Sequence, residues 1–364
     1  MTAHLGNRTG RTLAVAVGLS LAVAGCSSSN KTDAKAGSSG GNNNPTVASP
    51  SASASAAAGT CTAESVGYPK IADFHGVKVG FSQSEPDNAS FRAAETQSMR
   101  DEAKNQGAQL LYANADKKAD KQIADIKDLI TKGAKLLIVA PLNSDGLQPA
   151  WDAAKAAKVP VVTVDRLVNQ KPCLDYLTFI GSNFVSQGKR AADAMIKATG
   201  GKGNLVILLG SSGNGVTTDR TAGFVDQMKA AAPGIKIIAQ QTGDFDRATG
   251  QKVMAQLLQA HPDINAVYAE NDEMGVGAYN AIKAAGKKPG TDVKIISVDG
   301  IKDAVSKIVA GTYNGVVQSN PRFGPLAFAQ LKAFEDGTGV PPKVIITDDE
   351  YTPANAKAKL GGAF

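Results

Sequence analysis

The sequence has few of the side chains that bind transition metals or carry redox chemistry. Its 364 residues include three cysteines and three histidines, and no two cysteines stand in a CxxC spacing. A zinc centre or a thiol redox centre would therefore lack a ligand set. We expect neither a metal nor a cofactor.

Motifs of covalent catalysis and phosphate binding are missing as well. The GxSxG match at residues 37–41 lies in a Ser/Gly-rich segment and not at a strand-to-helix turn, and the sequence contains no HExxH and no Cys-His pairing. Residues 210–215 (GSSGNG) do not have the GxGxxG spacing, and no GKS or GKT follows them, so we interpret them as a turn. A glycosidase needs two carboxylates across the scissile bond, and Asp165 with Asp299 leaves that alternative open. We expect a binding protein and not an enzyme.

Positive charge is present without being concentrated. The formal net charge is +6, and the lysines and arginines are interspersed with acidic residues on predicted helix faces. Such a pattern is typical of a solvated surface, because proteins that bind nucleic acids gather Lys and Arg on one face. We therefore expect no nucleic-acid partner.

The first 25 residues have the pattern of an export signal. Arg8 and Arg11 precede an apolar run, residues 13–24, which is too short to span a bilayer as a permanent helix. The run ends in LAVAGC, which is similar to the bacterial lipobox, in which the cysteine, here Cys26, is lipidated after cleavage. An ordinary signal peptide with an incidental cysteine is the alternative. We predict a signal peptide over 1–25 and a lipid anchor at Cys26, on the outer face of the cell membrane.

Residues 26–60 are predicted to form a disordered tether after the anchor. Ser, Ala, Gly, Asn and Pro dominate this segment, so it cannot bury enough apolar surface to offset the loss of chain entropy. A flexible coil of this length spans about 30 Å, which would hold a folded domain clear of a membrane surface.

The remaining residues, 61–364, predict two doubly wound α/β lobes. Short apolar runs rich in Val and Ile alternate with amphipathic helical patterns, and this order favours parallel sheets covered by helices on both faces. The runs are 77–81, 109–112, 136–140, 161–164 and 177–180, followed by 204–209, 235–239, 266–269 and 293–298. We assign 61–182 and about 300–318 to the first lobe, and 183–299 and about 319–364 to the second.

The two cysteines of the folded region are Cys61 and Cys173. An exported protein meets oxidising conditions, so a disulfide between them is expected. The alternative is a pair of buried free thiols.

Polar side chains follow the predicted strands, where ligands bind in open parallel sheets. Asp, Glu, Asn, Gln and Arg donate and accept in the paired geometry that sugar hydroxyls require. Aromatic residues are only 5% of the chain, yet two phenylalanines stand in these polar loops and could stack on a sugar ring. Phe91 could equally be the first core residue of the following helix. The ligand-binding residues predicted from this pattern are Gln83, Glu85, Phe91, Arg92, Asp165, Arg166, Phe245, Asn271 and Asp299.

Residues 77–355 resemble the ribose-type periplasmic sugar-binding family, and within it the galactofuranose-binding branch. The segments that carry the resemblance are 79–83 (VGFSQ), 91–96 (FRAAET), 164–166 (VDR), 218–224 (TDRTAGF), 243–250 (GDFDRATG), 271–274 (NDEM) and 298–300 (VDG). Loop 84–90 departs from the branch pattern, and Phe91 stands where the branch has Trp.

The resemblance implies a two-lobe clamp with three crossover strands as a hinge, which captures a sugar for an ABC-type permease. It implies that Asp165 and Arg166 form hydrogen bonds with the sugar from the first lobe. It implies the same role for three residues of the second lobe and the hinge side, Arg220, Asn271 and Asp299. Phe91 and Phe245 would stack on the ring. We expect a monomer that binds a neutral monosaccharide, either a furanose or a pyranose, with a galactofuranose-like sugar favoured. A tethered sensor of a sugar or an autoinducer is the alternative, whereas a sugar-responsive transcription factor would carry an amino-terminal helix-turn-helix.

Overall fold

The computed structural model describes residues 52–54 and 61–364. The predicted signal peptide, Cys26 and most of the predicted tether lie outside the described residues. Three residues of that tether, Ala52–Ala54, form strand β1, which pairs antiparallel with strand β12 (Lys343–Ile346).

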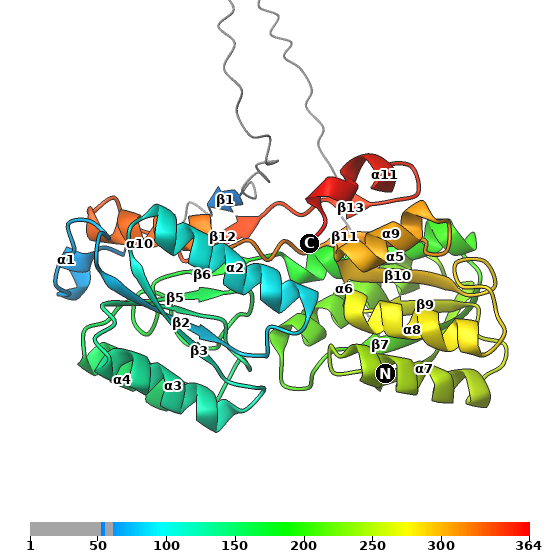
Figure 1. Cartoon of the computed structure of the whole chain (residues 1–364). Helices are drawn as coiled ribbons and strands as arrows, with labels where there is room; N and C mark the ends of the chain where they lie inside the picture. Colours follow the sequence, from blue (N-terminus) through cyan, green and yellow to red (C-terminus); the bar gives the residue numbers. More distant parts are fainter. Residues whose placement is uncertain (1–51, 55–60) are drawn as a thin grey trace, which may run out of the picture. The chain divides into compact units, whose positions relative to one another are not determined.

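The first lobe is built on a sheet with the strand order β1-β12-β6-β5-β4-β2-β3. Helices α2 and α10 pack on one face of this sheet, and α3 and α4 pack on the other (Figure 1). The remaining elements of the lobe are α1 (Ala63–Val66), β2 (Lys78–Gln83), α2 (Ser90–Asn105), β3 (Gln109–Asn114), α3 (Ala119–Thr131), β4 (Leu136–Val139), α4 (Gln148–Ala156), β5 (Val161–Val164), β6 (Phe179–Gly181) and α10 (Gly324–Glu335).

The second lobe repeats this plan on a sheet with the strand order β13-β11-β10-β9-β7-β8. Helices α5 and α6 cover one face, and α7, α8 and α9 cover the other. The elements are α5 (Phe184–Thr199), β7 (Gly203–Leu209), α6 (Gly215–Ala231), β8 (Ile235–Thr242), α7 (Arg247–Ala260), β9 (Ala266–Ala269), α8 (Asp272–Ala284), β10 (Lys294–Asp299), α9 (Lys302–Val309), β11 (Gly315–Gln318), β13 (Glu350–Tyr351), α11 (Ala356–Lys359) and a 3-10 turn (Leu360–Gly362).

The central strands are apolar along their whole length because both of their faces are covered. Every residue of β4, β5 and β9 is buried, as expected for strands in the middle of a parallel sheet. All nine apolar runs singled out in the sequence lie in or overlap β2 to β10. The prediction of two doubly wound parallel-sheet lobes is confirmed.

The chain crosses between the lobes three times, at residues 182–183, 319–323 and 347–349. The three crossovers contact one another through side chains. Ser182 Oγ donates to Asp348 Oδ1 at 3.2 Å and lies 3.4 Å from Ser319 Oγ. The crossovers therefore form one connected strip between the two sheets.

The structure corrects the predicted lobe boundaries after residue 299. Helix α9 and strand β11, which we predict in the first lobe, belong to the second, because β11 pairs in parallel with β10. Helix α10 and strand β12, predicted in the second lobe, belong to the first, because β12 pairs with β6 and α10 packs against α2. The last segment, from β13 onward, does lie in the second lobe.

A disulfide joins Cys61 to Cys173, as the sequence analysis expects. The Cys61 carbonyl also accepts a hydrogen bond from the Val340 amide at 3.0 Å, so the start of the folded region is attached to two parts of the first lobe. Among the described residues, no helix is both long enough and apolar enough to cross a membrane.

Removing the disulfide should lower the stability of the folded protein. It closes a loop across 112 positions of sequence, and loss of such a bond releases chain entropy in the unfolded state worth about 2 to 5 kcal/mol. We expect this decrease for the Cys61→Ala/Cys173→Ala variant in urea unfolding followed by circular dichroism. Dithiothreitol should destabilise the parent protein and leave the variant unchanged. Equal urea midpoints for the two proteins would contradict the prediction.

Candidate functional site

A cavity of about 40 Å³ of water-accessible space lies between the carboxyl ends of the two sheets. This is room for only a few water molecules, so a monosaccharide can enter only when the lobes separate. The lining residues are Glu85, Ala89, Phe91, Arg92, Asp165, Arg166, Val216, Arg220, Phe245, Asn271, Glu273 and Asp299. All ten predicted ligand-binding residues except Gln83 are in this set.

Arg92, in the first turn of α2, is surrounded by carboxylates from three segments of the first lobe. Its guanidinium lies 2.7 Å from Glu95, 2.8 Å from Asp165 and 3.4 Å from Glu85. All four side chains are at least nine-tenths buried. Burial raises the pKa of Glu95 to about 7, against the opposing charge of Arg92.

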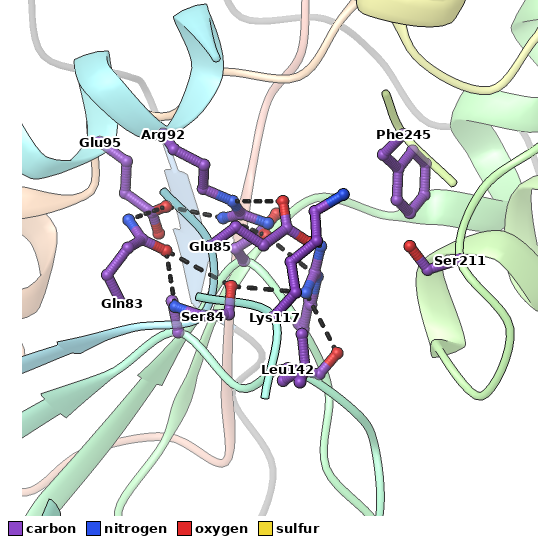
Figure 2. Close-up of polar contacts among 12 residues, drawn as sticks. Gln83, Ser84, Glu85, Arg92, Glu95, Lys117, Leu142, Ser211 and Phe245 are labelled. Atoms are coloured by element: carbon purple, nitrogen blue, oxygen red, sulfur yellow. Dashed lines mark hydrogen bonds and ion pairs between the residues drawn. The ribbon is translucent and has the colours of Figure 1, made fainter. Parts of the chain in front are cut away.

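Arg166 follows β5 and connects Asp165 to the loop after β2. Its Nη2 lies 2.5 Å from Glu85 Oε1, and its Nη1 donates to the Leu142 carbonyl at 3.1 Å. Burial acts to raise the pKa of Glu85, but the charges of Arg166 and Arg92 outweigh it and lower that pKa to about 2. Glu85 is thus an ionised, two-sided partner that fixes both arginines (Figure 2).

Gln83 does not line the cavity. Its Nε2 donates to Glu95 at 2.9 Å and to Thr96 at 3.3 Å, and its Oε1 accepts from the Ser84 amide at 2.9 Å. Figure 2 shows Gln83 below Glu95, on the side away from Phe245. Gln83 therefore orients the carboxylate behind Arg92, and the predicted direct contact with a ligand lacks a basis in the geometry.

Arg220, Asp299 and Asn271 form the opposite wall, on the second lobe. Arg220 donates to the Glu270 carbonyl at 2.6 Å and to Gln187 at 2.9 Å, and it lies 3.7 Å from Asp299. Burial raises the pKa of Asp299 well above its usual range, although the charge of Arg220 opposes this. Asn271 caps α8 by accepting from the Met274 amide at 2.9 Å, which fixes the direction of its side chain.

The two predicted phenylalanines both line the cavity. Phe91 also packs in the first lobe's core, where its ring contacts those of Phe323 and Phe364. Phe91 is therefore a core residue of the first lobe that also lines the cavity, and its stacking on a sugar stays a prediction. Phe245 approaches from the second lobe (Figure 2), and the centre of its ring is 5.9 Å from the Arg166 guanidinium.

The glycine-containing loop 210–215 forms a turn that leaves room for the Phe245 ring. A Cβ at Gly210 would lie 2.0 Å from the Phe245 ring, so only glycine leaves room for it. The Gly210 amide donates to the buried Glu270 carboxylate at 2.8 Å. The loop thus seats an aromatic side chain at the cavity.

Ala89, Val216 and Glu273 also line the cavity, although they are not among the residues predicted from the sequence. Glu273 had a usable signal, since it follows Asn271 by two residues in a segment already singled out. It reaches across to the first lobe, where its Oε1 accepts from the Ser90 amide and hydroxyl, each at 3.3 Å. Val216 and Ala89 are small apolar residues that nothing in the sequence distinguishes.

Further contacts hold the lobes together around the cavity. Lys117 of the first lobe donates to the Asp244 carbonyl at 3.2 Å, and the Gly215 amide donates to Ser144 Oγ at 3.2 Å. With the Ser90 to Glu273 bonds, these contacts place the described lobes in a closed arrangement.

The geometry suits a small neutral, polyhydroxylated molecule better than an ion. Each lining arginine already faces at least one buried carboxylate, so the cavity has no strong excess of either charge. Among the described residues, no cluster of His, Cys, Asp and Glu could hold a metal ion.

Comparison with known proteins places the chain in a family. Residues 79–356 match the model of the periplasmic binding protein domain. The galactofuranose-binding protein YtfQ of Escherichia coli (strain K12) is 36% identical over 287 residues, which cover 78% of this chain and 90% of that protein. The chain belongs to the periplasmic binding protein family. The relatives, including ribose import binding proteins, place it in the ribose-type sugar-binding group, whose members are solute-binding proteins and not enzymes.

Solved structures of periplasmic binding proteins agree with the fold. The arabinose ABC transporter component from Shewanella sp. ANA-3, bound to α- and β-L-arabinofuranose, is 35% identical, with a TM-score of 0.75 over 78% of this chain and 95% of that one. A Mycobacterium smegmatis protein in complex with β-D-fucofuranose is 36% identical, with a TM-score of 0.75 over 78% and 94%. Proteins of this family act outside the cytoplasm.

Buried carboxyls behind the site should make the stability depend on pH. Burial raises the pKa of Glu270 to about 7, although hydrogen bonds from Thr221 and Gly210 oppose the shift. The folded state then binds a proton that the unfolded chain releases near pH 4.5, so stability falls as pH rises from about 4.5 to 7. The contribution is about 3 kcal/mol at 1.36 kcal/mol per pKa unit.

The Glu270→Gln variant has no titrating group at this position. Its unfolding free energy should therefore decrease less than that of the parent as the pH rises from about 4.5 to 7. The measurement is the urea unfolding free energy at several pH values between 4.5 and 8. Glu64→Gln, which changes an exposed carboxyl, is the control and should keep the parent slope. A parent-like slope for Glu270→Gln would show that this carboxyl does not titrate in the window.

Proposed function

We propose that this protein is the extracytoplasmic sugar-binding component of an ABC importer, and that it binds one neutral monosaccharide between its two lobes. The observation that carries the proposal is the cavity itself. Buried arginine and carboxylate pairs line it from both lobes, and two phenylalanine rings flank them. Sugar hydroxyls both donate and accept, so they suit such mixed pairs, and the C–H faces of a sugar ring suit the aromatic rings.

A furanose is the favoured ligand. Of three relatives at 35 to 36% identity, one is named as a galactofuranose-binding protein, and two have structures in complex with L-arabinofuranose or β-D-fucofuranose. The small size of the cavity favours a ligand of one ring over a longer saccharide, and residues of both lobes line it. Asp165 and Arg166 would bond the sugar from the first lobe, and Arg220, Asn271 and Asp299 from the second.

Closure of the lobes would couple binding to delivery. The three crossovers form a connected strip on which one lobe can rotate against the other. A sugar that touches both walls binds the closed form better than the open form, and it shifts the equilibrium by that difference in affinity. The permease in the cytoplasmic membrane would then recognise the closed, loaded shape.

The anchor proposed at Cys26 would hold the protein at the membrane, with residues 27–60 as the tether. We propose that the protein acts as a monomer, since the cavity is complete within one chain. A tethered sensor that presents the loaded form to a receptor would use the same site. The two functions differ in whether the bound sugar enters the cell.

A ligand screen tests the proposed function. Residues 61–364 contain the disulfide and every described helix and strand except β1, and full-length protein serves as the reference. We expect a thermal shift and one-to-one binding in calorimetry with L-arabinose, D-galactose, D-ribose or D-fucose, without consumption of the sugar. Absence of binding to these and to other neutral sugars, sugar acids, polyols and furanones would overturn the proposal.

Substitution of Arg166 should weaken binding of the identified sugar. Arg166→Ala removes a charged donor from the cavity, and hydrogen bonds to charged groups contribute about 1.5 to 3 kcal/mol. Calorimetry measures the loss, and circular dichroism checks that the variant is folded. Arg100→Ala, which changes an arginine of the same lobe outside the cavity, should bind like the parent. Unchanged affinity of Arg166→Ala would remove this residue from the site.

The proposed anchor predicts a change in location alone. Cys26→Ser should release the exported protein from the membrane fraction, because the lipid would no longer be attached. Its affinity for the sugar should equal that of the parent, since the folded region is unchanged. Fractionation of cells that express each protein gives the result. Continued membrane attachment of Cys26→Ser would exclude lipidation at this cysteine.

A further inference from the structure

Phe364, the last residue of the sequence, contacts parts of both lobes. Its ring lies edge-on to that of Phe91, with 5.9 Å between ring centres and an angle of 77°. Phe91 lines the cavity from the first lobe. Phe364 packs against the apolar cores of both the first and the second lobe.

The main chain of Phe364 is bound to the second lobe next to the cavity. Its amide donates to the Gly300 carbonyl at 3.2 Å, and its carbonyl accepts from the Lys302 amide at 2.6 Å. Gly300 directly follows Asp299, which lines the cavity from this side. The second lobe thus holds Phe364 through two residues, Gly300 and Lys302, that closely follow Asp299 in the sequence.

The second crossover supplies a third contact. The Arg322 guanidinium lies 5.7 Å from the centre of the Phe364 ring, and its Nη1 donates to the Gly362 carbonyl at 3.4 Å. Burial lowers the pKa of Arg322. The phenylalanine therefore sits where the two lobes and a crossover meet.

We propose that Phe364 is a positioning residue of the binding site, which holds the Phe91 ring in place from the second lobe and stabilises the closed arrangement. This inference rests on the proposed sugar-binding function. When the lobes separate, the backbone of Phe364 moves with the second lobe while Phe91 moves with the first. The contact between their rings therefore adds to the stability of the closed form, which is the form that encloses a ligand.

The expected effect of Phe364→Ala is a weaker sugar complex. An aromatic pair contributes an amount that corresponds to a change of about 2- to 10-fold in the dissociation constant. The loss should be mainly in the dissociation rate, because the contact belongs to the closed complex. Phe364→Tyr keeps the ring and should restore parent-like affinity.

Leu360→Ala is the matched control. Leu360 belongs to the same terminal segment, but its apolar contacts are with the core of the second lobe. Its substitution removes comparable surface without touching Phe91. We expect parent-like affinity for this variant, even where its melting temperature decreases.

Calorimetry and stopped-flow with L-arabinose, D-galactose, D-ribose and D-fucose give the affinities and rates, and small-angle X-ray scattering gives the lobe arrangement without sugar. We expect ligand-free Phe364→Ala to be more extended on average than the parent. Equal affinity of Phe364→Ala and the parent, or an equal loss in Leu360→Ala, would overturn the inference and leave the proposed function standing. If the parent binds none of the sugars, the proposed function fails. The scattering measurement still tests the inference in that case, because equal scattering by the ligand-free parent and Phe364→Ala would overturn it.

Discussion

The structure of the site depends on a group of buried charges, each of which needs a partner of opposite charge. Arg92 and Arg166 share Asp165 and Glu85, and all four side chains are nearly excluded from water. Removing such charges from water is costly unless each has a partner at short range, so a change of any one member weakens the pairing of the others. This explains why the loop after β2, the start of α2 and the end of β5 are fixed in one arrangement. A sugar would meet donors and acceptors that are already oriented.

The two walls of the cavity differ in how fully their charges are paired. In the first lobe, Arg92 and Arg166 reach carboxylates at 2.5 to 2.8 Å. In the second lobe, Arg220 and Asp299 are 3.7 Å apart, and burial raises the pKa of Asp299. The two charges of the second wall are therefore less closely paired with each other, and Arg220 is held mainly by the Glu270 carbonyl and Gln187. A ligand between the walls would meet closely paired ions on the first lobe and a looser ion pair on the second.

The sequence predicted the sheets and most of the cavity because both follow from local pattern. Buried parallel strands are continuous apolar runs, and the polar residues directly after them must gather at one edge of each sheet. The predicted lobe boundaries after residue 299 were wrong because they depend on strand pairing and not on local pattern. Which sheet β11 and β12 join is decided by pairing with β10 and β6, the latter more than 150 positions away in sequence, and short runs carry no sign of their partner. Gln83 lies beneath the cavity and outside its lining, and nothing in the sequence around it distinguishes these two positions.

The ends of the described chain are attached to different lobes, which bears on how the proposed anchor and the lobe motion fit together. Strand β1 and the disulfide at Cys61 attach the amino-terminal side to the first lobe. The carboxyl-terminal segment is bound to the second lobe through Gly300 and Lys302. A tether from Cys26 would therefore hold the first lobe, which carries the strongly paired charges, and leave the second lobe free to rotate. Under that arrangement the anchor would not oppose closure, because β1 and Cys61, the described residues nearest to it in sequence, are both bound to the first lobe.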